Sequence, residues 1–264
     1  MDQVNWGESP FRWNSNPESF FQTPMRQEAL ARLEFLVGQH RRLGLLVGPS
    51  GSGKSLLLDI FAQQLRRRAR AVACLSLLDV EPSEVLWRLA SAWGLNPPAS
   101  WSTTWFWRAI EDRLFEYRCQ QIEAVVLFDD ADQADPRAWQ HVARLARFDT
   151  SSQTWLTLVL AGRNEGMARL GESLVELAEL RIDMEPWQRD DTREYVAKML
   201  AHAGRPTPVF EEPAVDRLHE LTHGNPRRVS QLADLALLAG AGQQLDQIDA
   251  NVVETAYQEL GVGV

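Results

Sequence analysis

The segment LLVGPSGSGKSLLL, residues 45–58, limits the possible folds of this chain more than any other. A short apolar run ends at a glycine, four residues follow, and Gly-Lys-Ser then opens an amphipathic helix. Glycines allow such a loop to wrap its backbone N–H groups around phosphate oxygens, beside a helix N-terminus that favours anions. The lysine would reach the β- and γ-phosphates of a nucleotide, and the serine would ligate Mg²⁺. The pattern predicts a phosphate-binding P-loop made of Gly48, Pro49, Ser50, Gly51, Ser52, Gly53, Lys54 and Ser55.

The choice of lysine in this loop supports the prediction. Arginine supplies nearly all the basic charge, and Lys54 and Lys198 are the only lysines in the chain. A compact ammonium fits between phosphates where a planar guanidinium does not. A lysine is therefore retained where the chemistry of a P-loop requires one.

A second segment, VVLFDDADQAD at residues 125–135, places acids at the end of an apolar strand. In P-loop nucleotidases an acid at the end of a nearby strand holds the metal. We therefore expect Asp129 to lie on the Mg²⁺ side of the site and Asp130 to polarise the attacking water. Asp132 and Asp135 either contribute to the same site or merely belong to a solvated loop.

Apolar periodicity predicts strands that alternate with helices as far as residue 184, which indicates a parallel sheet covered on both faces. The expected strands are 43–47, 71–76, 124–129, 155–161 and 180–184. The expected helices of this part are 25–39, 54–68, 82–93, 103–120, 138–147 and 167–179.

Beyond Pro186 the pattern is helical throughout, with helices expected at 190–202, 211–222, 226–239 and 246–260. The change of pattern predicts two domains, an α/β domain with an N-terminal arm at 1–185 and a helical domain at 186–264.

Composition excludes some classes of function. The 264 residues carry a formal net charge of −9, which argues against constitutive binding of nucleic acid. The two cysteines show no metal-type spacing, and no stretch has the length and apolarity of a signal peptide or of a membrane span of about 18 residues. A cytoplasmic location is the expectation.

The chain resembles the AAA+ ATPases, and among them the ExeA/GspA-like branch that also includes the transposition ATPases of the TnsC type. The resemblance covers nearly the whole length, and the segments that carry it include GPSGSGKS, EVLWRLASAWGLNPP, VVLFDDAD, LVLAGRNE and HGNPRRVSQLADLALLAG. It implies a P-loop α/β core with a parallel five-stranded sheet of order 5-1-4-3-2 and a small all-helical C-terminal lid. It also implies ATP and Mg²⁺ as cofactors, ATP hydrolysis and a homo-oligomer, either ring or filament.

The resemblance assigns further roles by position. Arg227, or its neighbour Arg228, matches the lid arginine that contacts the γ-phosphate. Arg163 or Asn164 matches the polar residue that senses this phosphate beside the P-loop. Arg181 matches the arginine that one subunit offers to the site of its neighbour, with a salt-bridged arginine of an edge strand as the alternative. The N-terminal FRWNSNPESFF supplies either an aromatic cover for adenine or plain packing.

One position departs from the family pattern. The family usually has Asp-Glu after the third strand, whereas this chain has Asp129-Asp130. Aspartate is one methylene shorter, so its carboxylate lies about 1.5 Å further back, and a misplacement of about 1 Å can cost about 10²-fold in rate. Slow hydrolysis is therefore expected.

Three functions follow from these features. The first is an ATPase that assembles head to tail and organises a protein partner of the secretion or envelope-assembly type. The second is a DNA-associated regulator of the transposition type, which the acidic net charge disfavours. The third is a nucleotide switch that does not hydrolyse ATP. The sequence does not name the partner.

Overall fold

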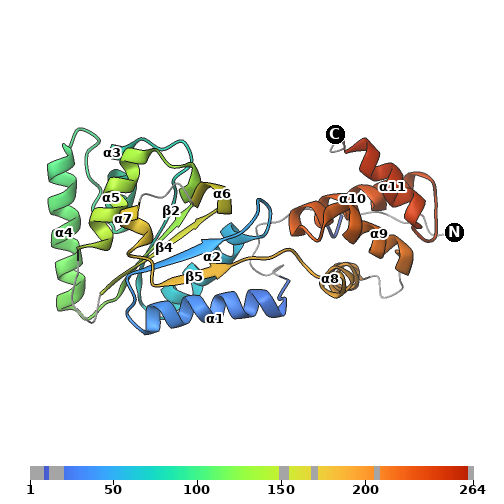
Figure 1. The fold of residues 1–264 in the computed structure, drawn as a ribbon, viewed down its shortest axis with the longest axis horizontal. Helices are drawn as coiled ribbons and strands as arrows, with labels where there is room; N and C mark the ends of the chain where they lie inside the picture. Colours follow the sequence, from blue (N-terminus) through green and yellow to red (C-terminus); the bar gives the residue numbers. More distant parts are fainter. Residues whose placement is uncertain (1–8, 12–20, 149–154, 168–171, 205–208, 261–264) are drawn as a thin grey trace. The chain divides into compact units, whose positions relative to one another are not determined.

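The computed structural model describes residues 9–11, 21–148, 155–167, 172–204 and 209–260. Five parallel strands form one sheet of order β2-β3-β4-β1-β5 (Figure 1). The strands are β1 (Leu43–Val47), β2 (Ala71–Ser76), β3 (Ala124–Asp129), β4 (Leu156–Gly162) and β5 (Leu180–Asp183). The fold and the strand order predicted from the sequence are confirmed.

Helices cover both faces of this sheet, and for this reason the central strands are apolar along their whole length. All residues of β1 and β4 are buried. The helices of this part are α1 (Pro24–Gly38), α2 (Lys54–Arg67), α3 (Pro82–Ala92), α4 (Thr103–Cys119), α5 (Pro136–Ala146), α6 (Asn164–Met167) and α7 (Glu172–Val175), with a 3-10 turn, η2 (Ala131–Gln133), before α5. Helices α1 and α2 pack on one face, whereas α3, α5 and, through α3, α4 lie on the other (Figure 1).

The helix predicted for residues 167–179 is wrong in extent. Two helices of four residues, α6 and α7, take its place, and residues 168–171 between them lie outside the described part. Gly166 lies in α6 and makes room for the side chain of Asp132, since a Cβ there would come within 2.2 Å of the Cβ of that residue. The apolar spacing of the segment did not reveal this constraint.

The C-terminal segment is helical, as expected, with α8 (Arg189–His202), α9 (Glu212–Thr222), α10 (Pro226–Gly242) and α11 (Ala250–Glu259). Local chemistry fixes their ends: the Asn225 side chain accepts a hydrogen bond from the backbone of Arg228 at the start of α10, and Asp249 does the same for Val252 at the start of α11. His223, with φ 51°, ends α9. Among the described helices, none combines the length and apolarity that crossing a membrane requires.

The contacts divide the described residues into two compact units. One comprises the described residues within 24–50 and 54–184, and the other comprises those within 1–23, 51–53 and 185–264. The helical unit has its own core, in which Phe11 and Phe21 are buried against Tyr195. These two aromatic residues of the N-terminal arm thus pack with the helices, while the sequence grouped the arm with the α/β domain. The boundary between 185 and 186 stays a prediction.

Candidate nucleotide-binding site

The glycine-rich loop joins the interior strand β1 to α2. It begins beside the end of β4, because the backbone N–H of Gly48 donates to the carbonyl of Gly162 at 3.2 Å. Gly51 and Gly53 have φ values of +80° and +96°, a region that other residues rarely adopt. These two glycines let the chain turn sharply, so that Lys54 becomes the first residue of α2.

The ammonium of Lys54 lies within the curve of the loop. Its Nζ donates to the carbonyl oxygens of Gly48 at 2.8 Å and Pro49 at 2.9 Å. Burial lowers the pKa of Lys54, while the charges of Asp129, Asp132 and Asp130 raise it and that of Arg163 lowers it. The acids that follow β3 therefore lie close enough to the P-loop lysine to act on its charge.

Asp129, the last residue of β3, faces the first turn of α2. Burial raises the pKa of this carboxyl and the Asp130 charge adds to the effect, whereas a hydrogen bond from the Ser55 side chain and one from the Asp130 N–H at 2.9 Å lower it. A serine hydroxyl beside a carboxylate is a pair of hard oxygen ligands. Mg²⁺ is commonly held in this way, by one or two carboxylates together with substrate phosphates. The residues present thus fit the magnesium site expected at Ser55 and Asp129.

Asp130 is held by a residue that the sequence did not reveal. The hydroxyl of Ser76, at the end of β2, donates to Asp130 Oδ2 at 3.0 Å. Asp130 itself has φ 51°, in the left-handed region. The parallel pairing of β2 with β3 brings the two side chains together. A polar residue at the end of the adjacent strand was the available signal for this contact.

The acids further along differ from each other. The Asp132 side chain is only 2% exposed and pairs with Arg163, whose Nε lies 2.7 Å from Asp132 Oδ2. The solvated-loop alternative is thus wrong for Asp132. Asp135 caps the start of α5, where it accepts from the backbone N–H of Arg137 at 2.7 Å.

Asn164, which follows the last residues of β4, is contacted by Arg181, the second residue of β5. Arg181 Nη2 donates to Asn164 Oδ1 at 2.8 Å and to Asp183 Oδ1 at 2.8 Å. β5 is an edge strand, and the Arg181 side chain is 56% exposed. The arginine is therefore salt-bridged and exposed at once, so its role towards a second subunit stays a prediction.

Arg227 and Arg228 lie in the first turn of α10, within the helical unit. The backbone of Arg228 is bound by the capping side chain of Asn225 at 3.2 Å. The role of either guanidinium towards a phosphate stays a prediction.

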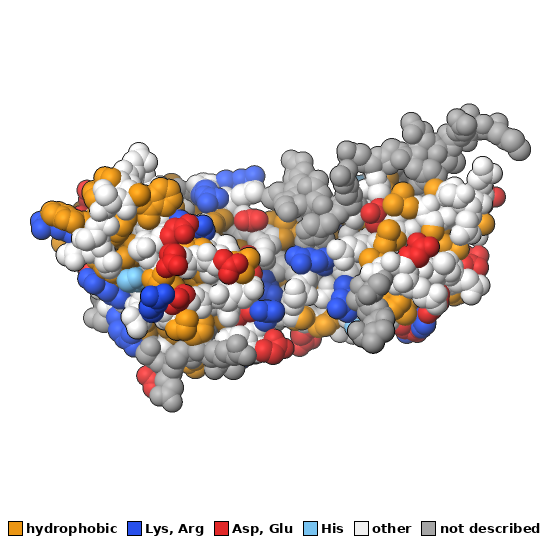
Figure 2. Space-filling model, turned by 90° about the horizontal axis from the view of Figure 1, so that it is seen from above, with side chains coloured by type: hydrophobic (Ala, Val, Ile, Leu, Met, Phe, Trp, Pro, Cys, Tyr) orange, Lys and Arg blue, Asp and Glu red, His pale blue; other side chains and the backbone are white. Residues whose placement is uncertain are grey.

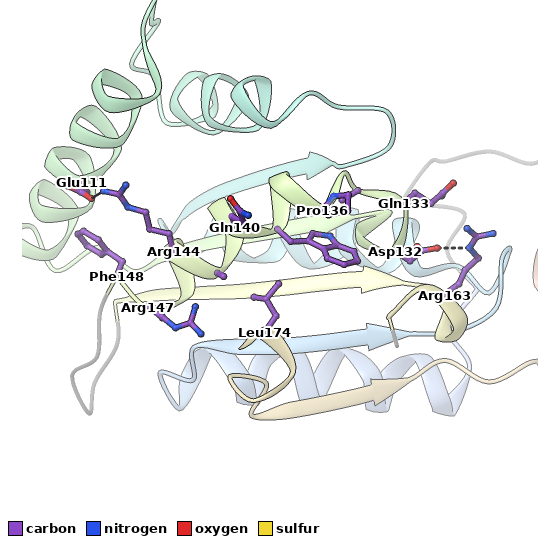
Figure 3. A pocket seen from close by; sticks show the side chains of 13 residues that line it. Glu111, Asp132, Gln133, Pro136, Gln140, Arg144, Arg147, Phe148, Arg163 and Leu174 are labelled. Atoms are coloured by element: carbon purple, nitrogen blue, oxygen red, sulfur yellow. Dashed lines mark hydrogen bonds and ion pairs between the residues drawn. The ribbon is translucent and has the colours of Figure 1, made fainter. Parts of the chain in front are cut away.

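A groove of about 1250 Å³ runs along α5 on the same face as Asp132 and Arg163 (Figure 3). Asp132 and Arg163 lie at one end, and Glu111, Arg144 and Phe148 lie at the other (Figure 3). Arg144 is engaged there, since it pairs with Glu111 at 2.8 Å and stacks on Trp107. The Asp132–Arg163 pair thus lines one end of this groove, and the charges of both residues act on Lys54.

A parallel sheet with a glycine-rich loop after the interior strand β1, and with β4 between that strand and the acid-bearing β3, defines a P-loop nucleotide-binding protein. Comparison with known families agrees. The chain belongs to the family described as "AAA domain", whose model matches residues 37–170, about half of the chain. The resemblance to AAA+ ATPases inferred from the sequence is confirmed.

One curated relative is the "General secretion pathway protein A" of Aeromonas hydrophila. It is 26% identical over 260 residues, and the match covers 97% of this chain and 47% of the relative. The chain thus spans about half the length of that protein.

Solved structures share the fold. Cdc6p from Pyrobaculum aerophilum has a TM-score of 0.73 at 17% identity, covering 98% of this chain and 72% of its own. The Aeropyrum pernix ORC1 protein in complex with DNA has a TM-score of 0.71 at 19% identity, covering 92% and 67%. The Thermotoga maritima RuvB Holliday junction branch migration motor has a TM-score of 0.61 at 16% identity, covering 96% and 74%.

Proposed function

We propose that this protein is a Mg²⁺-dependent ATPase that binds ATP at Gly48–Ser55, hydrolyses it slowly and assembles head to tail. The observation that carries the proposal is the arrangement around Lys54. Its ammonium lies in the curve of the loop, Ser55 contacts Asp129, and three carboxylates act on the lysine charge. Membership of the AAA family supports the same chemistry.

Each residue of the proposed site has a separate role in nucleotide binding or hydrolysis. Lys54 exchanges its loop carbonyls for the β- and γ-phosphates, while Ser55 and Asp129 hold Mg²⁺, which neutralises phosphate charge when bound. Asp130 accepts hydrogen bonds from the attacking water. Ser76 binds the same carboxylate at 3.0 Å, so this hydrogen bond must break or rearrange before Asp130 acts. Together with the shorter side chain, this contact supports a slow rate.

Assembly brings in a second subunit. Arg181, exposed on the edge strand, is the residue we propose for contact with the γ-phosphate bound by a neighbour, and Arg227 is its counterpart from the helical domain in the same chain. Such an arginine can raise the rate about 10³- to 10⁵-fold. The similarity to a general secretion pathway protein favours a protein partner of the secretion or envelope-assembly type.

A DNA-associated regulator is the second candidate, because one similar structure was solved in complex with DNA. The net charge of −9 weighs against it. On the face shown in Figure 2, the described Lys and Arg side chains are interspersed with Asp and Glu. Retention of duplex DNA in the presence of ATP that weakens steeply with salt would favour this candidate over the first.

The decisive experiment is phosphate release from ATP and Mg²⁺ over a wide range of protein concentrations. We expect the specific activity to rise with concentration, because the site is completed by a neighbouring Arg181. Lys54→Ala should abolish nucleotide binding, and Arg181→Ala should remove the dependence on concentration. Tight ATP binding with background release at every concentration would contradict hydrolysis and leave a nucleotide switch.

A further inference from the structure

Arginine is concentrated in the segments of the chain that lead into the strands. In the sequence, five such segments contain eight arginines and four acids, although the whole chain has a net charge of −9. They are residues 39–42, 66–70, 118–123, 147–154 and 176–179. The strands are parallel, so the residues that enter them lie at one edge of the sheet, called here the amino edge. Positive charge is thus in excess on one side of the α/β unit.

Side-chain contacts join the described parts of the amino edge. Glu123, before β3, pairs with Arg70, before β2. His40 Nδ1, before β1, lies 3.6 Å from Glu123 Oε1, and the centre of the His40 ring lies 6.3 Å from that of Trp155, before β4. The segments that enter four neighbouring strands therefore form one continuous surface.

Two exposed phenylalanines accompany these arginines. Phe115 in α4 is 66% exposed, and Phe148, which follows α5, is 38% exposed. Both border a hollow of about 210 Å³, which is also lined by Leu114, Arg118, Trp155 and Leu156. Figure 3 shows Phe148 and Arg147 near the ends at which the strands begin, and Arg163 at the opposite ends. The amino edge thus presents apolar rings beside guanidinium groups.

The stability of the fold explains only part of this arrangement. Arginine is favourable in the last turn of a helix, which accounts for Arg66 and Arg67 in α2. Arg41 pairs with Glu179 at 3.1 Å within the same edge. Neither effect accounts for large apolar side chains that remain in water beside the positive charges. Aromatic rings and basic groups side by side are what the interface of an anionic membrane favours, because the rings enter the headgroup layer while the cations meet the lipid phosphates.

We propose that the amino edge binds the surface of an anionic lipid bilayer, with Phe115 and Phe148 inserted among the headgroups. Duplex DNA also offers phosphates, but its bases are stacked inside, so it has no comparable apolar layer for the two rings. Lys54 and Asp129 follow the opposite ends of the strands, so this contact does not cover them. The inference goes beyond the proposed function and does not depend on nucleotide binding.

The test measures co-sedimentation of the full chain with vesicles of phosphatidylcholine, either alone or mixed with about one third phosphatidylglycerol. We expect binding to the anionic vesicles only, with a large loss at high salt, which screens the charges. Phe115→Ser should weaken this binding about 10-fold, because it removes an apolar ring from the interface. Arg67→Gln should weaken it about 5-fold, as expected for one cation near an anionic surface.

The same helix supplies matched controls. Trp105 is 57% exposed and precedes Phe115 in α4 by ten residues, or about 15 Å along the helix. Arg108 precedes Arg118 by the same distance and is also exposed. We expect Trp105→Ser and Arg108→Gln to bind anionic vesicles as the wild type does. Because Phe115 and Trp105 are both largely exposed, neither substitution removes a side chain from the core.

Three results would overturn the proposal. The first is equal binding to both kinds of vesicle, or to neither. The second is a loss in Trp105→Ser as large as that in Phe115→Ser, which would show that any exposed aromatic ring of α4 has the same effect. The third is binding of duplex DNA that Arg67→Gln weakens, together with vesicle binding that Phe115→Ser leaves unchanged, which would assign the amino edge to nucleic acid.

Discussion

At the residue scale, Asp129 illustrates how a buried carboxyl group lowers the stability of the protein that carries it. Burial raises its pKa above the ordinary 3.8. The folded state then binds more protons than the unfolded state between these two pKa values, so stability falls as the pH rises through that interval. The charged form of this carboxyl therefore costs the folded state some stability.

We therefore predict that Asp129→Asn melts at a higher temperature than the wild type at pH 7 without Mg²⁺ or nucleotide. The difference should shrink as the pH falls from the raised pKa of Asp129 towards 3.8, where the wild-type carboxyl is also neutral. Thermal unfolding of both proteins over a pH series measures this difference in melting temperature. Asp135→Asn should show no gain at pH 7, because hydrogen bonds from Arg137 lower the pKa of Asp135 and its charged form is the favoured one. Equal melting temperatures for Asp129→Asn and wild type at pH 7 would contradict the account.

A second residue-scale prediction concerns Asp130. The variant Asp130→Glu advances the carboxylate by one methylene, so we expect faster release of phosphate at saturating ATP, by up to about 10²-fold. Ser76→Ala removes the hydrogen bond that holds Asp130 and should raise the same rate by a smaller factor. Steady-state kinetics of both variants provide the measurement. A rate no higher than wild type in Asp130→Glu would mean that the length of this side chain does not limit hydrolysis.

At the scale of elements, the sequence predicted most of what its local patterns encode. Apolar runs located all five strands, and the P-loop glycines located the turn between β1 and α2. The contacts that the sequence did not reveal join residues that are far apart in the chain. Ser76 meets Asp130 only because β2 pairs with β3, and Arg163 meets Asp132 because both follow strands that end at the same edge of the sheet.

In the segment between β4 and β5, a contact with a distant part of the chain made the prediction from the local sequence pattern wrong. Its apolar spacing predicts one helix, yet α6 and α7 have only four residues each. Gly166 leaves space for the side chain of Asp132 in η2, so this position is constrained by another part of the chain. Helix propensity and periodicity describe a segment alone and contain no information about such a neighbour.

At the scale of the whole molecule, the two units have separate cores, which predicts two unfolding transitions. Phe61, fully buried in α2, belongs to the α/β unit, and Phe210, 4% exposed, belongs to the helical unit. Replacing either by Leu should cost on the order of 1 kcal/mol and shift one transition by a few degrees. Calorimetry of both variants shows which of the two unfolding transitions each substitution shifts. A single transition that moves with both variants would argue against the division near residue 185.

The scarcity of lysine leaves only two side-chain amines for chemical labelling, Lys54 and Lys198. Lys54 lies in the P-loop with its pKa lowered by burial, and Lys198 lies 5.5 Å from the centre of the Phe21 ring in the helical unit. The neutral amine attacks the acylating reagent, and the share of neutral amine grows as the pKa falls. Modification of one lysine therefore reports on occupancy of the phosphate loop, while modification of the other serves as its internal standard. Arginine side chains stay charged at these pH values and are not acylated.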